Sequence, residues 1–146
     1  MPDPRLRILL IDDNRHGLVA RRAVLEQLGH KVTVAASGQD GIDLFQSQPF
    51  DLVVTDYRMP EVSGQQVIRK IRQQDQLIPI VLLSGYVESL GLTEQSTGAD
   101  VVLSKGPREV QDLLRAIERL SRRRKPAKRA AAAAGTGTRA RKQKAG

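Results

Sequence analysis

Acidic, hydroxyl and amino side chains stand at or just beyond the ends of four short apolar runs in this sequence. The five residues are Asp12, Asp13, Asp56, Ser84 and Lys105. Three carboxylates that lie close together cannot all stay ionised without a counter-charge. A hard divalent cation with oxygen ligands and retained waters, such as Mg²⁺, supplies that charge. If the four run ends meet in the fold, they make a magnesium site with a hydroxyl and an ammonium group beside it.

The chemistry that suits such a site is phosphoryl transfer to a carboxylate. Carboxylates form acyl phosphates in enzymes, and Asp56 is the central carboxylate, so it is the best placed nucleophile. The transfer depends on in-line positioning and on neutralising the phosphoryl oxygens. Mg²⁺ can neutralise one oxygen and Lys105 a second. The Ser84 hydroxyl or nearby backbone N–H groups can neutralise the third.

Each of these residues also has an ordinary structural explanation. Asp12 and Asp13 precede a helical pattern and can act as its N-cap. Asp56 and Ser84 can be turn residues, and Lys105 can be a solvated lysine. The joint pattern favours a site, because every residue lies at the same end of its apolar run.

The segments that must position these residues alternate between two patterns. Apolar runs predict strands over 7–11, 31–35, 51–55, 79–83 and 100–104. Apolar residues at helical spacing predict helices over 15–28, 38–47, 64–73, 87–95 and 108–124. This alternation predicts an α/β fold, a parallel sheet with helices on both faces, which binds ligands at the carboxyl ends of its strands. The flavodoxin-like strand order 2-1-3-4-5 is one of two common orders, and periodicity does not choose between them.

The net charge of +8 divides unevenly along the chain. Residues 122–146 contain ten Lys or Arg and no acid, whereas residues 1–121 contain 14 basic and 16 acidic side chains. From Pro126 onward the sequence has no large apolar residue, so it cannot contribute to a core. We therefore expect a globular domain over 1–121 and a disordered basic tail over 122–146.

The composition excludes several kinds of protein. The chain has no cysteine, which rules out disulfides, thiolate metal sites and thiol nucleophiles and fits a reducing compartment. Its longest apolar runs are a few residues, so we expect no membrane span. Its first residues lack the apolar region of a secretory signal. A cytoplasmic location is the resulting expectation.

Taken together, these motifs resemble the receiver domain of two-component response regulators. The resemblance rests on residues 8–14, 51–60, 80–86 and 98–100, with Gly64 and Lys105, and runs from about Leu6 to Leu120. It implies the doubly wound flavodoxin-like fold with five strands in the order 2-1-3-4-5. It also implies a stand-alone receiver similar to the chemotaxis regulators, because no output domain follows residue 121.

The resemblance implies the roles of the acidic residues. Asp56 is the implied phosphoacceptor. Asp13 resembles the direct Mg²⁺ ligand of the family, and Asp12 the ligand that acts through a water molecule. The backbone carbonyl of Arg58 resembles the third protein ligand. The implied cofactor is therefore Mg²⁺, with Asp56 itself among its ligands.

Two further residues match the switch residues of the family, and two positions depart from it. Ser84 resembles the hydroxyl that moves toward the phosphoryl group, and Lys105 the lysine that pairs with that group. Val102 stands where the family usually has an aromatic residue that turns inward. Gly106 replaces the usual proline after the lysine, and a cis bond before a non-proline residue is rare. Pro107 is instead expected in the first turn of the last helix.

The implied function is a phosphorylation-controlled protein-interaction switch and not an enzyme. Receivers take their phosphoryl group from a sensor histidine kinase or a phosphotransfer protein, and they assist their own phosphorylation and dephosphorylation. The family signals mostly through the face that corresponds to segments 87–95, 100–104 and 108–124. The downstream partner here is an unknown protein.

Two other classes of function stay open. Because Val102 and Gly106 depart from the family, the chain could be a pseudo-receiver that works as an interaction module without phosphate. Its basic tail could add weak, salt-sensitive contact with nucleic acid. A metal-dependent phosphatase or nucleotide-using enzyme has less support, because the sequence has no Walker-type glycine-rich loop.

Overall fold

Five parallel strands form the sheet of the part of the chain that the structure describes. The structure is a computed structural model that describes residues 5–134, and side chains up to residue 122. The strands are β1 (Arg7–Ile11), β2 (Lys31–Ala35), β3 (Leu52–Asp56), β4 (Ile80–Ser84) and β5 (Val101–Ser104). Their order in the sheet is β2-β1-β3-β4-β5, with every pair parallel. This order confirms the fold class that the resemblance implied.

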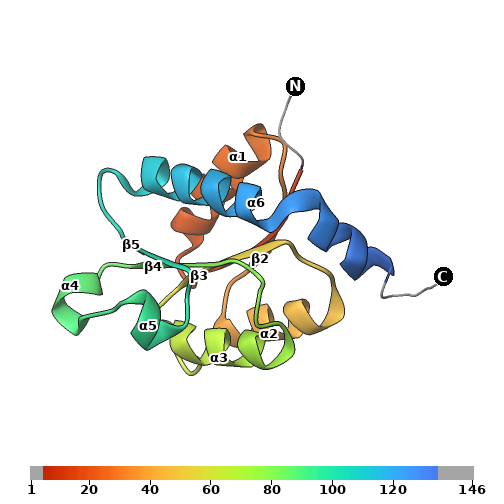
Figure 1. The fold of residues 1–146 in the computed structure, drawn as a ribbon. Coiled ribbons are helices and arrows are strands. Elements are labelled where there is room, and N and C mark those ends of the chain that lie inside the picture. The colour runs from red at the N-terminus through yellow and green to blue at the C-terminus, as the bar shows by residue number, and fades with distance from the viewer. Residues whose placement is uncertain (1–4, 135–146) are drawn as a thin grey trace. The chain divides into compact units, whose positions relative to one another are not determined.

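Helices connect the strands and cover both faces of the sheet. They are α1 (Arg15–Gln27), α2 (Gly38–Ser47), α3 (Gly64–Gln74), α4 (Val87–Leu90), α5 (Glu94–Thr97) and α6 (Glu109–Ala134). Figure 1 shows α2 and α3 on one side of the sheet and α1 on the other. The chain divides into two compact units, Met1–Ala116 and Ile117–Gly146. The sheet, α1 to α5 and the first two turns of α6 belong to the first unit.

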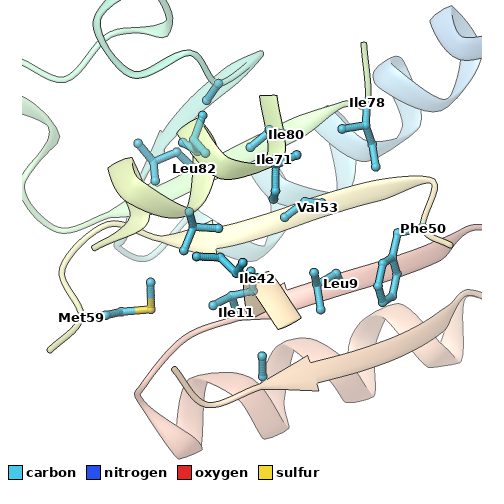
Figure 2. Packing of buried hydrophobic residues seen from close by; sticks show 14 of the residues in the cluster. Leu9, Ile11, Ile42, Phe50, Val53, Met59, Ile71, Ile78, Ile80 and Leu82 are labelled. Atoms are coloured by element: carbon cyan, nitrogen blue, oxygen red, sulfur yellow. The ribbon is translucent and has the colours of Figure 1, made fainter. Parts of the chain in front are cut away.

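An apolar core fills the space between the sheet and α2 and α3. Figure 2 shows Leu9, Val53 and Ile80 projecting from neighbouring strands toward Ile42 of α2 and Ile71 of α3, all of them buried. In the central strands β1, β3 and β4 the alternate residues are buried on the opposite face, because successive side chains of a strand point to opposite sides. Burial on both faces explains why the sequences of these three strands are continuous apolar runs.

The segment 87–95, predicted as one helix, forms the two short helices α4 and α5. The first ends at Gly91, whose φ of 63° lies in the left-handed region that glycine adopts without steric cost. Thr93 then caps α5, because its side chain accepts a hydrogen bond from the Ser96 N–H. The C-cap and the N-cap stand almost side by side in the sequence, so a continuous helix does not form.

The last helix is longer than its apolar stripe predicts. α6 ends at Ala134, whereas the stripe predicts an end near Arg124 and the tail composition predicts disorder from residue 122. Alanine, lysine and arginine are strong helix formers, and extending an existing helix avoids the cost of a new nucleus. The helix continues through Pro126, although proline has no N–H to donate and is unfavourable in a helix interior. The disorder predicted for 135–146 lies outside the described residues, and the domain boundary at 121/122 stays a prediction. None of the helices in the described chain is both long and apolar enough to cross a membrane.

Candidate functional site

The three predicted carboxylates meet at the carboxyl edge of the sheet. Asp12 and Asp13 follow the last residue of β1, and Asp56 is the last residue of β3. These strands pair in parallel with Ile11 opposite Thr55, so both chains reach the edge at the same level. One carboxylate oxygen from each aspartate lies within 4.8 Å of the other two. A set of ligands made only of oxygen, at this spacing, fits a hard cation such as Mg²⁺.

Asp12 is a buried carboxylate with several donors. Its Oδ1 accepts a hydrogen bond from the Asn14 N–H at 2.9 Å. Its Oδ2 accepts from Arg21 Nη1 at 2.7 Å and lies 3.4 Å from Lys105 Nζ. Burial raises the pKa of Asp12, but the Asn14 hydrogen bond and the charges of Lys105 and Arg21 outweigh it, and the pKa falls below its ordinary value. Asp12 is therefore ionised in the fold. The N-cap of α1 is Asn14, and neither aspartate has that role.

Asp56 is also buried, but its environment raises its pKa, whereas the environment of Asp12 lowers the pKa of that residue. Burial and the negative charge of Asp12 raise the pKa of Asp56, and Lys105 and the Tyr57 N–H offset only part of that effect. Oδ1 accepts from the Tyr57 N–H at 2.8 Å and lies 3.1 Å from Lys105 Nζ. Within the described chain no hydrogen bond reaches Oδ2. The fold thus holds one oxygen of Asp56 and leaves the other available for a new bond.

Ser84 and Lys105 stand at the carboxyl ends of the next two strands of the sheet: Ser84 is the last residue of β4, and Lys105 directly follows β5. Ser84 is the buried last residue of β4, and its Oγ accepts a hydrogen bond from the Tyr86 N–H at 2.9 Å. The Lys105 N–H donates to the Ser84 carbonyl at 3.0 Å, which ties the two loops together. No peptide bond in the described residues is cis. Pro107 lies in a turn before α6 begins at Glu109, and not in the first turn of the helix as predicted.

Arg58 lies in the exposed loop two residues after Asp56. Its guanidinium carbon stands 4.7 Å from the centroid of the Tyr86 ring, a cation–π contact between the loops that follow β3 and β4. The predicted role of Arg58 concerns its backbone carbonyl, and the side-chain contact connects the loop that carries this carbonyl to the loop after β4.

The start of α3 approaches the end of β3 so closely that residue 64 has no room for a side chain. A Cβ atom at Gly64 would lie 2.1 Å from the Asp56 carbonyl oxygen and 2.8 Å from the Tyr57 Cα. The Gly64 N–H donates to the Tyr57 carbonyl at 2.7 Å. Ser63 and Gln66 form a capping box that begins α3 at this point. These contacts position the backbone that carries Asp56.

Replacing Gly64 with alanine is expected to destabilise the protein by about 2 kcal/mol or more, because the added methyl group meets backbone atoms that cannot yield locally. Urea unfolding of the two proteins measures the difference. Gly85→Ala is the matched control, since a Cβ atom there meets nothing within 4 Å. Equal stability of the two variants would show that the α3 start can move without cost.

Arg21 of α1 contacts the site, and the sequence analysis missed it. Its side chain is buried and reaches both Asp12 and Glu109. Arg21 lies three residues after Leu18 and four before Leu25, which are buried on the same face of α1. A charged residue on the buried face of a helix needs a buried partner. That interruption of the apolar face is the signal that could have identified Arg21.

Most of this chain is similar to known proteins. A family model described as the response regulator receiver domain matches residues 8–118. The chain is 34% identical to a gliding motility regulatory protein of Myxococcus xanthus over 124 residues, which are 80% of this chain but 15% of that protein. It therefore spans a small part of the curated relatives that it matches.

Two solved structures illustrate the similarity in fold. A response regulator receiver domain protein from Clostridium thermocellum has a TM-score of 0.72 and 30% identity, over 81% of this chain and 95% of the other. The receiver domain of a sensor histidine kinase from Pseudomonas aeruginosa has a TM-score of 0.72 and 27% identity, over 81% and 98%. The second structure has a magnesium ion coordinated in its active site cleft.

Proposed function

Because this chain belongs to the response regulator receiver domain family, we propose that it is a switch that accepts a phosphoryl group on Asp56. Receiver domains of this family are regulatory phosphoacceptors, and sensor histidine kinases phosphorylate them. The proposed donor is a sensor histidine kinase or a phosphotransfer protein. The observation that carries the proposal is the meeting of Asp12, Asp13 and Asp56 within 4.8 Å, with Lys105 Nζ 3.1 Å from Asp56.

In the proposed reaction, Asp56 Oδ2 attacks the phosphorus atom of the donor. The bond between phosphorus and the donor nitrogen breaks as the bond between phosphorus and Oδ2 forms, and an acyl phosphate results. The hydrogen bond from Tyr57 and the ion pair with Lys105 act on Oδ1 and orient the carboxylate. Correct orientation matters because phosphoryl transfer depends on in-line geometry.

The residues that would hold Mg²⁺ are Asp12, Asp13 and Asp56, with the backbone carbonyl of Arg58. Once bound, the ion would neutralise charge on the phosphoryl oxygens. Asp13 is exposed, whereas Asp12 is buried and already contacts Arg21. This difference supports Asp13 as the direct ligand and Asp12 as a ligand through water.

Lys105 and Ser84 are proposed to contact the phosphoryl group itself. The Lys105 ammonium can pair with a phosphoryl oxygen without leaving the neighbourhood of Asp56, from which it stands 3.1 Å. The Ser84 Oγ acts as an acceptor toward the Tyr86 N–H, so its hydroxyl proton is available to a phosphoryl oxygen. Through these two residues the chain would assist its own phosphorylation and dephosphorylation.

The second candidate is an interaction module that works without phosphate. The observation in its favour is Val102, which is partly buried against the core where the family usually has an aromatic residue. This side chain is too small to act as the usual rotating aromatic.

The downstream protein, the cytoplasmic location and nucleic-acid contact through the tail stay predictions. The tail side chains from residue 123 lie outside the described part of the chain.

A phosphorylation assay tests the proposal. The full chain is incubated with Mg²⁺ and acetyl phosphate, and intact-protein mass spectrometry follows the product. The expected result is one phosphoryl group per chain, located on the peptide that contains Asp56 and absent when EDTA removes the metal. If neither acetyl phosphate nor a phosphorylated histidine kinase yields this adduct, the switch is wrong and the interaction module is favoured.

A further inference from the structure

Arg21 connects the candidate magnesium site to the start of the last helix. Its Nη1 donates to Asp12 Oδ2 at 2.7 Å, and its Nε donates to Glu109 Oε2 at 2.6 Å. We propose that Arg21 is a positioning residue that acts as an internal counter-cation, holding Asp12 and competing with the divalent cation for its carboxylate. The inference rests on the proposed function, since it concerns the same metal site.

Asp12 has little capacity left for a metal ion. The residue is 1% exposed, Asn14 occupies Oδ1, and Arg21 and Lys105 both face Oδ2. A buried carboxylate needs a counter-charge, and here Arg21 supplies it at the shorter distance. An arriving cation must therefore approach a carboxylate that is already neutralised, against the repulsion of a fixed guanidinium. Arg21 thus weakens the binding of Mg²⁺ while it keeps Asp12 stable without the metal.

Gly17 makes room for this guanidinium. It lies four residues before Arg21, and therefore on the same face of α1. A Cβ atom at Gly17 would stand 2.7 Å from Arg21 Nη1. Glycine inside a helix is unfavourable compared with alanine. The helix is therefore less stable at this position, where the Arg21 guanidinium packs against its backbone. This feature of α1 is independent of the ion pairs, and it favours a fixed position of the Arg21 guanidinium against the helix.

Glu109 partly neutralises the positive charge that Arg21 presents to Asp12 and the candidate metal site. It is the first residue of α6, where a carboxylate also interacts favourably with the helix dipole. Its carboxylate pairs with Arg21 through both Nε and Nη2. Removing the charge of Glu109 leaves the charge of Arg21 less compensated, whereas removing Arg21 frees Asp12. The two changes are therefore expected to shift Mg²⁺ affinity in opposite directions.

Titration calorimetry of the full chain with Mg²⁺, in the absence of phosphodonor, tests the inference. For Arg21→Met, the Kd for Mg²⁺ is expected to fall about tenfold, because a nearby positive charge is lost. For Glu109→Gln, the Kd is expected to rise severalfold. Arg22→Met is the matched control, with an unchanged Kd. It removes the same charge from the adjacent position of α1, where the side chain is 48% exposed and pairs with Glu26.

Further results separate the inference from the proposed function. An equal Kd for wild type and Arg21→Met overturns the inference and leaves the proposed function standing. Absence of Mg²⁺ binding in both proteins overturns the metal site itself and the inference with it. If Arg21→Met does not fold, Glu109→Gln decides the question: a higher Kd for Mg²⁺ supports the inference, and an unchanged Kd overturns it. A purely structural Arg21 would lower stability without opposite shifts in Kd.

Discussion

Asp56→Asn is expected to abolish phosphorylation of this chain and to raise its free energy of unfolding at neutral pH. The amide lacks the negative charge and the nucleophilic oxygen that an acyl phosphate requires. The stability gain has a separate cause. Burial and the charge of Asp12 raise the pKa of Asp56, so the fold disfavours the ionised form. The asparagine removes that unfavourable charge and keeps the size and shape of the side chain.

The direction of the pKa shift sets the pH dependence of this gain. A carboxyl group whose pKa is higher in the folded state costs stability as pH rises from its ordinary pKa through the raised one. The cost is complete above the raised pKa and absent below the ordinary pKa of 3.8. Asp56→Asn should therefore be more stable than wild type at pH 7 and lose that advantage near pH 3. Asp12 has a lowered pKa, so its contribution has the opposite sign and is lost in acid.

Two measurements check this prediction. Intact mass after incubation with acetyl phosphate and Mg²⁺ reports the adduct, and urea unfolding at pH 7 and pH 3 reports stability. Asp43→Asn serves as the control, since Asp43 is an exposed residue of α2. A normal yield of adduct in Asp56→Asn would place the acceptor elsewhere. A variant less stable than wild type at pH 7 would contradict the charge-repulsion argument.

Lys105→Met is expected to slow phosphorylation about 100-fold, the typical effect of removing one fixed donor from a reacting oxyanion. Lys105 Nζ stands 3.1 Å from Asp56 Oδ1 and 3.4 Å from Asp12 Oδ2. It is therefore the cation that the two carboxylates share. Without it their mutual repulsion is less compensated, so the free energy of unfolding at neutral pH should also fall.

The lysine prediction is checked by initial rates of adduct formation at saturating Mg²⁺ and by urea unfolding at low metal. Lys70→Met is the matched control, because Lys70 is exposed on α3. Saturating Mg²⁺ should recover part of the lost stability, since a bound cation replaces the missing charge, but not the rate. If Lys105→Met reacts at the wild-type rate, Lys105 has no role in the transfer.

Much of the fold could be predicted because the three central strands, β1, β3 and β4, are buried on both faces. A strand of that kind reads as an apolar run, and the predicted strand boundaries differ from those of β3, β4 and β5 by one residue. The bounds of α2 match the prediction, since Ser37 caps one end and Pro49 closes the other. Prediction failed where local capping decides the outcome, as at Gly91 and Thr93, and where α6 continues through Pro126 to Ala134.

The sequence by itself determined which groups reach the functional edge. Asp12, Asp13, Asp56, Ser84 and Lys105 all stand at strand ends, and a parallel sheet brings strand ends of one kind to one edge. Only the tertiary structure decided the pKa shifts of Asp12 and Asp56 and the hydrogen bonds and ion pairs that fix their positions. Arg21 meets Glu109 across 88 residues of chain and meets Asp12 across nine, and Gly17 makes room for it. Such contacts depend on how α1 and the start of α6 pack. No local pattern encodes that packing, because the partners become neighbours only when the sheet has formed.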